Sequence, residues 1–296
     1  MTLSDRNGDT FWDTEVIRTI LSLQPQLYGG SVQIKNQDNI QIHSWLEWSR
    51  PKREYQWKSG RSAMELARHW FTSATPRIPD ELAKIFDQSA VFKNLCITEG
   101  WPEYETKIPP NDEEGRNHDL LLLGQVDAGD RVLISIEAKV DESYGDNTIG
   151  QYYRMKLREK GEGSSTRVPF RIETLLPHIF KAHALPEKPP WKNIRYQLLT
   201  ALSGTLIEAS NRSCPKAIFL IHEFLTDECD AKKVKKNEKA FLLLMNTLDL
   251  IDGEMPIDNE YLYGPLSYPK SDLLTSPVDL YIGKIRTDWG IVDLNN

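Results

Sequence analysis

The pattern of hydrophobic and polar positions predicts a β-hairpin near the middle of the chain. Two nearly continuous apolar runs, residues 120–123 and 132–136, are typical of strands that are covered on both faces. Between them stands Asp127-Ala128-Gly129, and a three-residue loop with glycine in the left-handed conformation is a favoured hairpin connection. We therefore predict that residues 118–140 form two antiparallel strands joined by this loop.

The length of the loop decides which side chains lie together. With the three-residue loop, Asp119 lies opposite Glu137 on the same face, and Lys139 joins them because alternate strand residues point the same way. A four-residue loop ending at Asp130 would turn Asp119 to the other face, since a one-residue slip flips every side chain. We predict the first register, or a bulge with the same result.

Helical spacing of apolar residues predicts helices around this hairpin, and shorter apolar runs predict further strands. Three of the predicted helices cover about residues 14–23, 195–210 and 231–248. Two more are predicted, one that begins at Ser62 and one that is capped by Asp80. The predicted strands are residues 95–106, 216–224 and 278–285, with a strand-like segment at 31–48. Gly204 would let its helix pack closely on the sheet.

We expect one main domain, residues 62–296, with an N-terminal extension, residues 1–61, packed on it. The stretch 141–191 is rich in Gly, Arg, Lys and Pro and is predicted to be an insertion. The C-terminal helix and strand would extend the same sheet. A chain of 296 residues is long enough to bury one large core.

Composition indicates a soluble, cytoplasmic protein. Three scattered cysteines suit a reducing compartment, charged residues interrupt any signal peptide in residues 1–20, and no apolar run is long enough for a membrane span. The net charge of −7 argues against general nucleic-acid binding, which relies on many phosphate contacts to Lys and Arg. Such binding would use local basic patches, at residues 50–61, 152–160 and 232–239, or these are ordinary solvated faces.

The charges at the end of the apolar hairpin carry the candidate chemistry. Charges at the rim of such a sheet cost free energy unless they are paired or bound to a cation. They form either an ordinary salt bridge or a site for Mg²⁺ or Mn²⁺, since a hard cation needs only one or two carboxylates. Asp119, Glu137 and the main-chain carbonyl of Ala138 would be its ligands, and Lys139 would orient or deprotonate the attacking water.

Asp119 followed by Glu137-Ala138-Lys139 resembles the motif of the PD-(D/E)XK nuclease superfamily. In that motif an acid lies on the second core strand and E-x-K on the third, and His118 here replaces the proline. The string IEAKVDESYG is also similar to a bacterial family of uncharacterised proteins in this superfamily. With the helix at Asp80 counted as an extra helix and 141–191 as an insertion, the predicted order of elements from Ser62 to Phe224 agrees with the core order of the superfamily, helix, strand, strand, strand, helix, strand.

The resemblance implies an α/β fold with a restriction-endonuclease-like core (α-β-β-β-α-β), in which a mixed central sheet is flanked by helices. It implies a metal-dependent nuclease, with DNA favoured over RNA as the substrate. The insertion, residues 141–191, would contact that substrate. If both strands of a duplex are cut, the protein would be a homodimer. Positions in the superfamily imply two accessory site residues, Gln197 after E-x-K and Glu65 on the first helix. For Gln197 the alternative is an ordinary surface residue of its helix, which is the favoured interpretation. Glu65 also completes a capping box with Ser62, which is the favoured interpretation.

Two other functions remain open at this point. The chain would be a nuclease-fold module that binds or regulates a partner without cleavage, which the acidic composition favours. Alternatively, it is a salt-bridged α/β domain in which Glu137-Ala138-Lys139 has no affinity for metal. The retention of Asp119, Glu137 and Lys139 together favours the nuclease.

Overall fold

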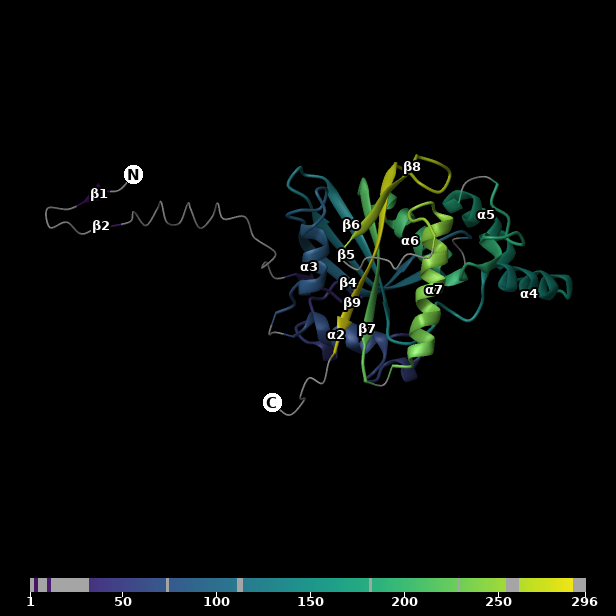
Figure 1. Cartoon of the computed structure of the whole chain (residues 1–296), viewed down its shortest axis with the longest axis horizontal. Coiled ribbons are helices and arrows are strands. Elements are labelled where there is room, and N and C mark those ends of the chain that lie inside the picture. Colours follow the sequence, from purple (N-terminus) through teal and green to yellow (C-terminus); the bar gives the residue numbers. More distant parts are fainter. Residues whose placement is uncertain are drawn as a thin grey trace.

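A seven-stranded mixed sheet forms the centre of the protein (Figure 1). The computed structural model describes residues 32–289, apart from 73–74, 111–113, 181–182, 228 and 254–260, together with a hairpin of β1 (Leu3–Ser4) and β2 (Thr10–Phe11). The strand order of the large sheet is β3-β4-β5-β6-β7-β9-β8. Its strands are β3 (Gln33–Ile34), β4 (Cys96–Thr106), β5 (Arg116–Gln125), β6 (Arg131–Lys139), β7 (Lys216–Leu225), β8 (Leu262–Tyr268) and β9 (Val278–Asp288).

The strand directions divide this sheet into two parts. The β4–β5 and β5–β6 pairs are antiparallel, whereas β6–β7 and β7–β9 are parallel, as is β3–β4, and β8 returns antiparallel to β9. The three strands predicted outside the hairpin are confirmed as β4, β7 and β9, and β9 extends the same sheet as expected. Strand β8 was not predicted, because its Gly264-Pro265 pair is typical of a loop.

The predicted hairpin and its register are confirmed. Pairs run from Gln125 opposite Arg131 to Leu120 opposite Ile136, which leaves Asp127-Ala128-Gly129 as the loop. Gly129 has φ of +88° and donates its N–H to the carbonyl of Val126, so glycine occupies the left-handed position that this turn requires. Continued by one step, this register places Asp119 opposite Glu137.

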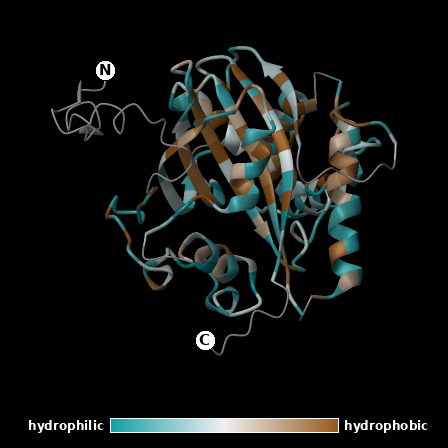
Figure 2. Cartoon of the chain, turned by 60° about the vertical axis from the view of Figure 1, so that its left-hand side comes forward, coloured by the Kyte–Doolittle hydropathy of each residue, from teal (hydrophilic) through white to brown (hydrophobic). Residues whose placement is uncertain are grey.

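Helices cover both faces of the sheet (Figure 1). On one face α2 (Ser62–Trp70) and α3 (Asp80–Asp87) pack on Leu120, Leu122 and Ile136. On the other lie α5 (Val168–Phe180), α6 (Tyr196–Asn211) and α7 (Ala231–Thr247), with α4 (Ile149–Gly161) farther out. Figure 2 shows hydrophobic residues concentrated on the strands between these layers, which are therefore buried on both sides.

Helix α6 approaches the sheet closely at Gly204. A Cβ atom at this position would lie 3.0 Å from Arg116 Cγ and 3.1 Å from His118 Cε1. Such distances are tighter than ordinary carbon contacts, so a larger residue would have to displace these two side chains by a few tenths of an ångström. The close packing predicted for Gly204 is confirmed, and it brings the start of α6 next to the end of the hairpin.

Several local predictions were wrong. The stretch 141–191 contains two helices, and α5 belongs to the core because its apolar side packs on α6. In the strand-like segment 31–48 only β3 is a strand, followed by a loop and a short 3₁₀ helix, Trp45–Glu47. Asp80 was predicted to be the N-cap residue of α3, but the N-cap residue is Pro79 and Asp80 is the first residue of the helix. The helix predicted at residues 14–23 lies outside the described residues.

The capping box expected at α2 is absent. Arg61, not Ser62, is the N-cap residue, and its side chain makes no capping hydrogen bond. Glu65 reaches back to the main-chain N–H of Gly60, at 2.7 Å, which is two residues farther than in a capping box. The N–H of Ser62 is instead bound by the carboxylate of Glu142, which comes from a loop after β6.

Candidate active site

The ladder between β4 and β5 is interrupted at the predicted acidic site. Main-chain pairing holds up to Pro102 and resumes at Tyr104, so that it skips Glu103 and the residue opposite it, Asp119. Glu103 has φ of +52°, a left-handed conformation that is uncommon for residues other than glycine and that clusters at functional sites. The two strands part at this point, and both side chains line the same pocket.

This pocket has a volume of about 610 Å³ and lies at the end of the hairpin opposite its turn. Asp119 from β5, Glu137 and Lys139 from β6, and Gln197 from the first turn of α6 all line it. The structure therefore brings four of the predicted side chains together. Ala138, predicted to contribute its carbonyl, lies between Glu137 and Lys139 on β6.

Glu137 is the centre of the hydrogen-bond network. Its Oε1 accepts hydrogen bonds from Lys139 Nζ at 2.6 Å and from Gln197 Nε2 at 2.7 Å, and Arg116 Nη2 contacts its Oε2. Only 2% of the Glu137 side chain is exposed. Both oxygens of this carboxylate therefore have partners, as a buried charge requires.

Asp119 is hydrogen-bonded to the main chain of the neighbouring strand. Its Oδ2 accepts a hydrogen bond from the N–H of Ala138 at 2.7 Å, and within the described residues its Oδ1 accepts none. The N–H and C=O of one strand residue point to the same side of the strand. The carbonyl of Ala138 is therefore directed toward β5 as well, on the side of Asp119.

Three carboxylates in one pocket perturb one another. Burial raises the pKa of Asp119 to about 7, and the charge of Glu137 adds to this rise. Burial also raises the pKa of Glu103 to about 8, with a further contribution from Asp119. Burial alone would raise the pKa of Glu137, but Arg116 and Lys139 outweigh it, so that its pKa is lowered. Near neutral pH, Glu137 carries the charge while Asp119 and Glu103 partly retain protons.

Lys139 is held in its charged form. Burial alone would lower its pKa, but the charges of Glu137 and Asp119 outweigh burial, and the pKa is raised. Its Nζ lies 5.6 Å from the centre of the Tyr144 ring, which is buried beneath it. In this arrangement Lys139 donates hydrogen bonds and does not accept a proton.

Glu65 lies outside this set. Besides the bond to Gly60, its Oε1 lies 3.5 Å from Arg68 Nη1, and it does not line the pocket. The acid that does line the pocket near α2 is Glu142, held by the N–H of Ser62 at 3.1 Å. The structure thus gives Glu65 a local role at the start of α2.

The sequence analysis gave no role to Arg116, Asn117 or Glu103, all of which line the pocket. Asn117 Nδ2 donates to Glu103 Oε2, and 5% of Glu103 is exposed. The available signals were a polar run directly before Asp119 and an acid inside a predicted strand. Neither signal shows which face of the strand is occupied, so contact with Glu137 could not be inferred.

One of the three basic patches reaches the pocket. Lys52, Arg53 and Arg61, all from residues 50–61, line it. The patches at 152–160 and 232–239 lie on α4 and α7 and do not line it. Among the described residues, no helix has the length and apolar character needed to cross a membrane.

The donors around Asp119 suit a hard divalent cation. Within the described ranges, no three His, Cys, Asp or Glu side chains converge as a complete metal-binding group. Mg²⁺ does not require one, because it keeps several waters and is bound by one or two carboxylates. Asp119 Oδ1 and the Ala138 carbonyl have the right chemistry, and Glu137 joins them if Arg116 moves away from its Oε2. The residues fit such an ion with that one displacement.

Residues 41–288 match the model of a family described as a domain of unknown function (DUF6946). The chain belongs to this family. No curated protein and no solved structure matches the chain. The match to DUF6946 spans β4 to β9 and contains every residue of the pocket described above.

Proposed function

We propose that the protein is a Mg²⁺- or Mn²⁺-dependent nuclease with a restriction-endonuclease-like core, and that it hydrolyses phosphodiester bonds. The observation that carries this proposal is the convergence of Asp119, Glu137, Lys139 and Gln197 in one pocket. An α/β domain with an incidental salt bridge would need only Glu137 and Lys139. It would not need Asp119 held by the main chain of Ala138 beside them.

The arrangement of elements supports the same proposal. If α3, α4 and α5 are counted as additions to the core, α2 is followed by the antiparallel strands β4, β5 and β6, then by α6 and by β7, which is parallel to β6. This is the order expected for the α-β-β-β-α-β core. The acid and the E-x-K triplet stand on its second and third strands.

The site residues have distinct parts in this proposal. Asp119, Glu137 and the Ala138 carbonyl would hold the cation, which when bound would supply Lewis-acid activation and lower the pKa of a water molecule. Lys139 Nζ, charged and fixed by Glu137, would orient the attacking water and offset negative charge on the phosphate. Gln197 would hold Glu137 Oε1 in position.

DNA is the favoured substrate, by resemblance to the superfamily. Lys52, Arg53 and Arg61 lie on one side of the pocket and would bind phosphates that flank the scissile bond. Because the whole chain carries a net charge of −7, binding would be confined to this edge of the molecule.

A second candidate function is a binding module without catalysis. The observation that favours it is that both oxygens of Glu137 are already bound by Arg116, Lys139 and Gln197. A site that is neutralised by its own side chains needs no metal to be stable. The two candidates therefore differ in whether a divalent cation enters the pocket.

The test is cleavage of supercoiled plasmid and of single-stranded DNA with Mg²⁺ or Mn²⁺. Wild-type protein should cut, EDTA should stop it, and Asp119→Ala and Lys139→Ala should each reduce the rate by about a hundredfold or more. Asp87→Ala and Lys93→Ala remove the same groups from exposed positions outside the pocket and should cut like the wild type. All variants must first show cooperative unfolding.

Equal activity in all five proteins would reveal a contaminant and refute the site assignment. No activity on DNA or RNA, together with no Mn²⁺ binding by calorimetry, would refute the nuclease and favour the binding module. Mn²⁺ binding that is lost in Asp119→Ala but is not accompanied by cleavage would place the metal correctly and reject the activity.

A further inference from the structure

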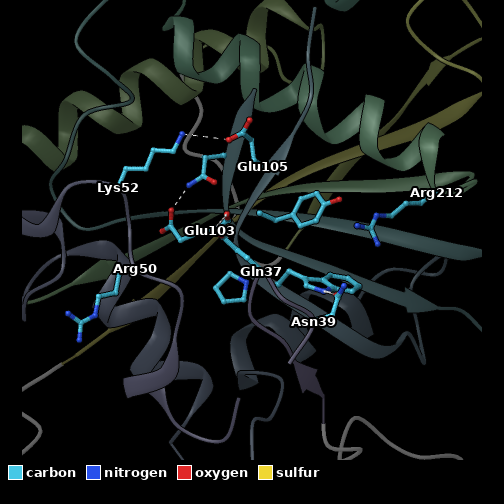
Figure 3. Close-up of a pocket in the computed structure, with 11 residues that line it drawn as sticks. Gln37, Asn39, Arg50, Lys52, Glu103, Glu105 and Arg212 are labelled. Carbon is cyan, nitrogen blue, oxygen red and sulfur yellow. Dashed lines mark hydrogen bonds and ion pairs between the residues drawn. The ribbon is translucent and has the colours of Figure 1, made fainter. Parts of the chain in front are cut away.

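A second pocket, of about 510 Å³, adjoins the first (Figure 3). Lys52, Glu103 and Asn117 line both, so the left-handed residue Glu103 stands at their boundary. The volume is within the range of pockets that hold small molecules, roughly 300–1,000 Å³. No part of the proposed catalytic set, Asp119, Glu137 or Lys139, lines this second pocket.

One wall of the pocket is a stack of planar groups. The guanidinium of Arg212 lies 4.8 Å from the ring centre of Trp101 and 5.0 Å from that of Tyr104. Arg212 Nε is fixed by Glu208 Oε1 at 2.6 Å, and 22% of the Arg212 side chain remains exposed. Glu208 therefore holds the Arg212 guanidinium close to both rings, and all three planar groups line the pocket.

The rest of the lining carries side-chain amides and charged groups. Gln37 and Asn39 come from the loop after β3, and the Oδ1 of Asn39 accepts a hydrogen bond from Trp101 Nε1 at 3.0 Å. Gln37 Nε2 reaches the carbonyl of Glu103 at 3.3 Å. Arg50 lies at the rim, as Figure 3 shows. The pocket thus combines planar surfaces, amide groups, the cations Arg50 and Lys52, and the carboxylates Glu103 and Glu105, of which Glu105 lies 3.6 Å from Lys52.

This combination fits a nucleobase. Unpaired bases are bound by stacking on aromatic rings or on guanidinium planes, and their edges are read by side-chain amides. Arg50 and Lys52 would face the phosphate that carries the base. Since Glu103 borders both pockets, a phosphate beside Asp119 would have its neighbouring base within reach of Arg212 and Gln37.

We propose that this second pocket binds one unstacked base of the nucleic acid whose phosphate lies in the catalytic pocket. The inference rests on the proposed nuclease function and specifies its substrate. A base in a continuous duplex is stacked on both faces and paired along its edge, so it must leave the helix to enter. The preferred substrate is therefore single-stranded or locally opened nucleic acid.

The experiment uses the full chain with Ca²⁺ in place of Mg²⁺ and four-nucleotide single strands that are too short to slide. Each strand lacks the base at one of its four positions and competes with a fluorescent strand for the protein. One abasic position should weaken binding about tenfold, the usual effect of losing one stacked base, whereas the others should change it less than about twofold.

Two variants locate the effect. Arg212→Lys keeps the charge and removes the planar guanidinium, and Gln37→Ala removes an exposed amide without disturbing the core. In both variants, an abasic nucleotide at the sensitive position should weaken binding no more than an abasic nucleotide at the other three positions. Gln41→Ala makes the same change as Gln37→Ala at an exposed position outside the pocket and should leave the wild-type profile intact.

Cleavage of the same strands with Mn²⁺ is measured separately. Cleavage with a flat abasic profile would overturn the base pocket and leave the nuclease standing. A sensitive position that persists in both variants would also overturn it, because the base would then be bound elsewhere. A sensitive position that disappears in the variants, without cleavage, would support the base pocket and reject the nuclease. No competition by any strand would overturn both.

Discussion

Replacing Arg116 by methionine should increase the affinity of the pocket for a divalent cation. Arg116 Nη2 contacts Glu137 Oε2, and only 10% of the Arg116 side chain and 2% of the Glu137 side chain are exposed. A cation that binds Glu137 must displace a guanidinium that already neutralises it. Methionine keeps an unbranched stem beside Gly204 and removes the charge.

The magnitude follows from the strength of this ion pair. Two unit charges about 4 Å apart attract one another by about 4 kcal/mol at an effective dielectric constant of about 20, and loss of hydration cancels part of this. A hydrogen bond between charged groups contributes about 1.5–3 kcal/mol net. Since about 1.4 kcal/mol is a factor of ten, the affinity should rise roughly ten- to hundredfold. The metal-free variant should lose a similar amount of folding stability, because Glu137 keeps only Lys139 as a cation.

Calorimetric titration with Mn²⁺ at about pH 8 measures the effect, because the pKa of about 7 leaves Asp119 mostly ionised there. Thermal unfolding with and without Mn²⁺ should show a larger metal-induced stabilisation in Arg116→Met than in the wild type. Arg116→Lys keeps a positive charge and should stay close to the wild type. Equal or weaker Mn²⁺ binding by Arg116→Met would refute the competition between Arg116 and the metal.

Three further predictions concern protonation and packing. Because the pKa values of Asp119 and Glu103 are raised to about 7 and about 8, the folded protein holds protons that the unfolded chain loses. The free energy of unfolding of the metal-free protein, measured by urea titration, should therefore fall as the pH rises from about 5 to 8. Mn²⁺ should reverse this trend, and its binding should release protons into a weakly buffered solution. Burial, with a contribution from His69, lowers the pKa of His222 from 6.5 to about 3. This shift opposes the effect of the two carboxyls between about pH 5 and 6.5, and below about pH 4, where the carboxyls are protonated in both states, it should make stability fall with falling pH. The contribution of His222 reaches up to about 5 kcal/mol, and His222→Gln should flatten that acid limb. Gly204→Ala should lower the free energy of unfolding in urea by about 1–3 kcal/mol, because its Cβ would press on Arg116 and His118. Gly161→Ala, where no atom lies within 4 Å of the new Cβ, should leave that free energy unchanged or raise it slightly. Equal effects of the two substitutions would contradict the close approach of α6 to the sheet at Gly204.

The parts of the fold that could be predicted from the sequence depend on neighbouring residues. The hairpin register follows from a three-residue loop and from Gly129, which alone adopts the required positive φ in that turn. Helix α6 follows from its apolar spacing. In both cases the deciding interactions lie within a few positions along the chain, where the pattern of residue types contains them.

The insertion shows where this local information ends. Glycine, proline and charged residues in 141–191 indicated irregular structure, yet α5 is a core helix. Arg171 in its first turn is buried, and its guanidinium donates hydrogen bonds to the carbonyls of Pro109 at 2.9 Å and Glu114 at 2.8 Å. These partners are about sixty residues away, and no periodicity within α5 reveals them.

The candidate site shows the same limit more sharply. Strict alternation from Leu121, which packs with α6, would put Arg116 on the face of β5 turned away from Glu137. In the structure Arg116 and His118 lie against Gly204 of α6, so the alternation is broken between His118 and Leu121. On the neighbouring strand, Trp101 and Tyr104 likewise pack toward α6, and Glu103 lies between them in its left-handed conformation.

The two breaks are coupled, because the ladder omits Glu103 and Asp119 at the same step. One irregularity thus opens the pocket around Asp119, turns Arg116 onto Glu137, and leaves Glu103 at the boundary of the two pockets. A regular pair of strands would keep Asp119 but would lose both the competing cation and the second pocket. In the proposed nuclease, the distortion at Glu103 therefore links the metal affinity of the site to the choice of substrate.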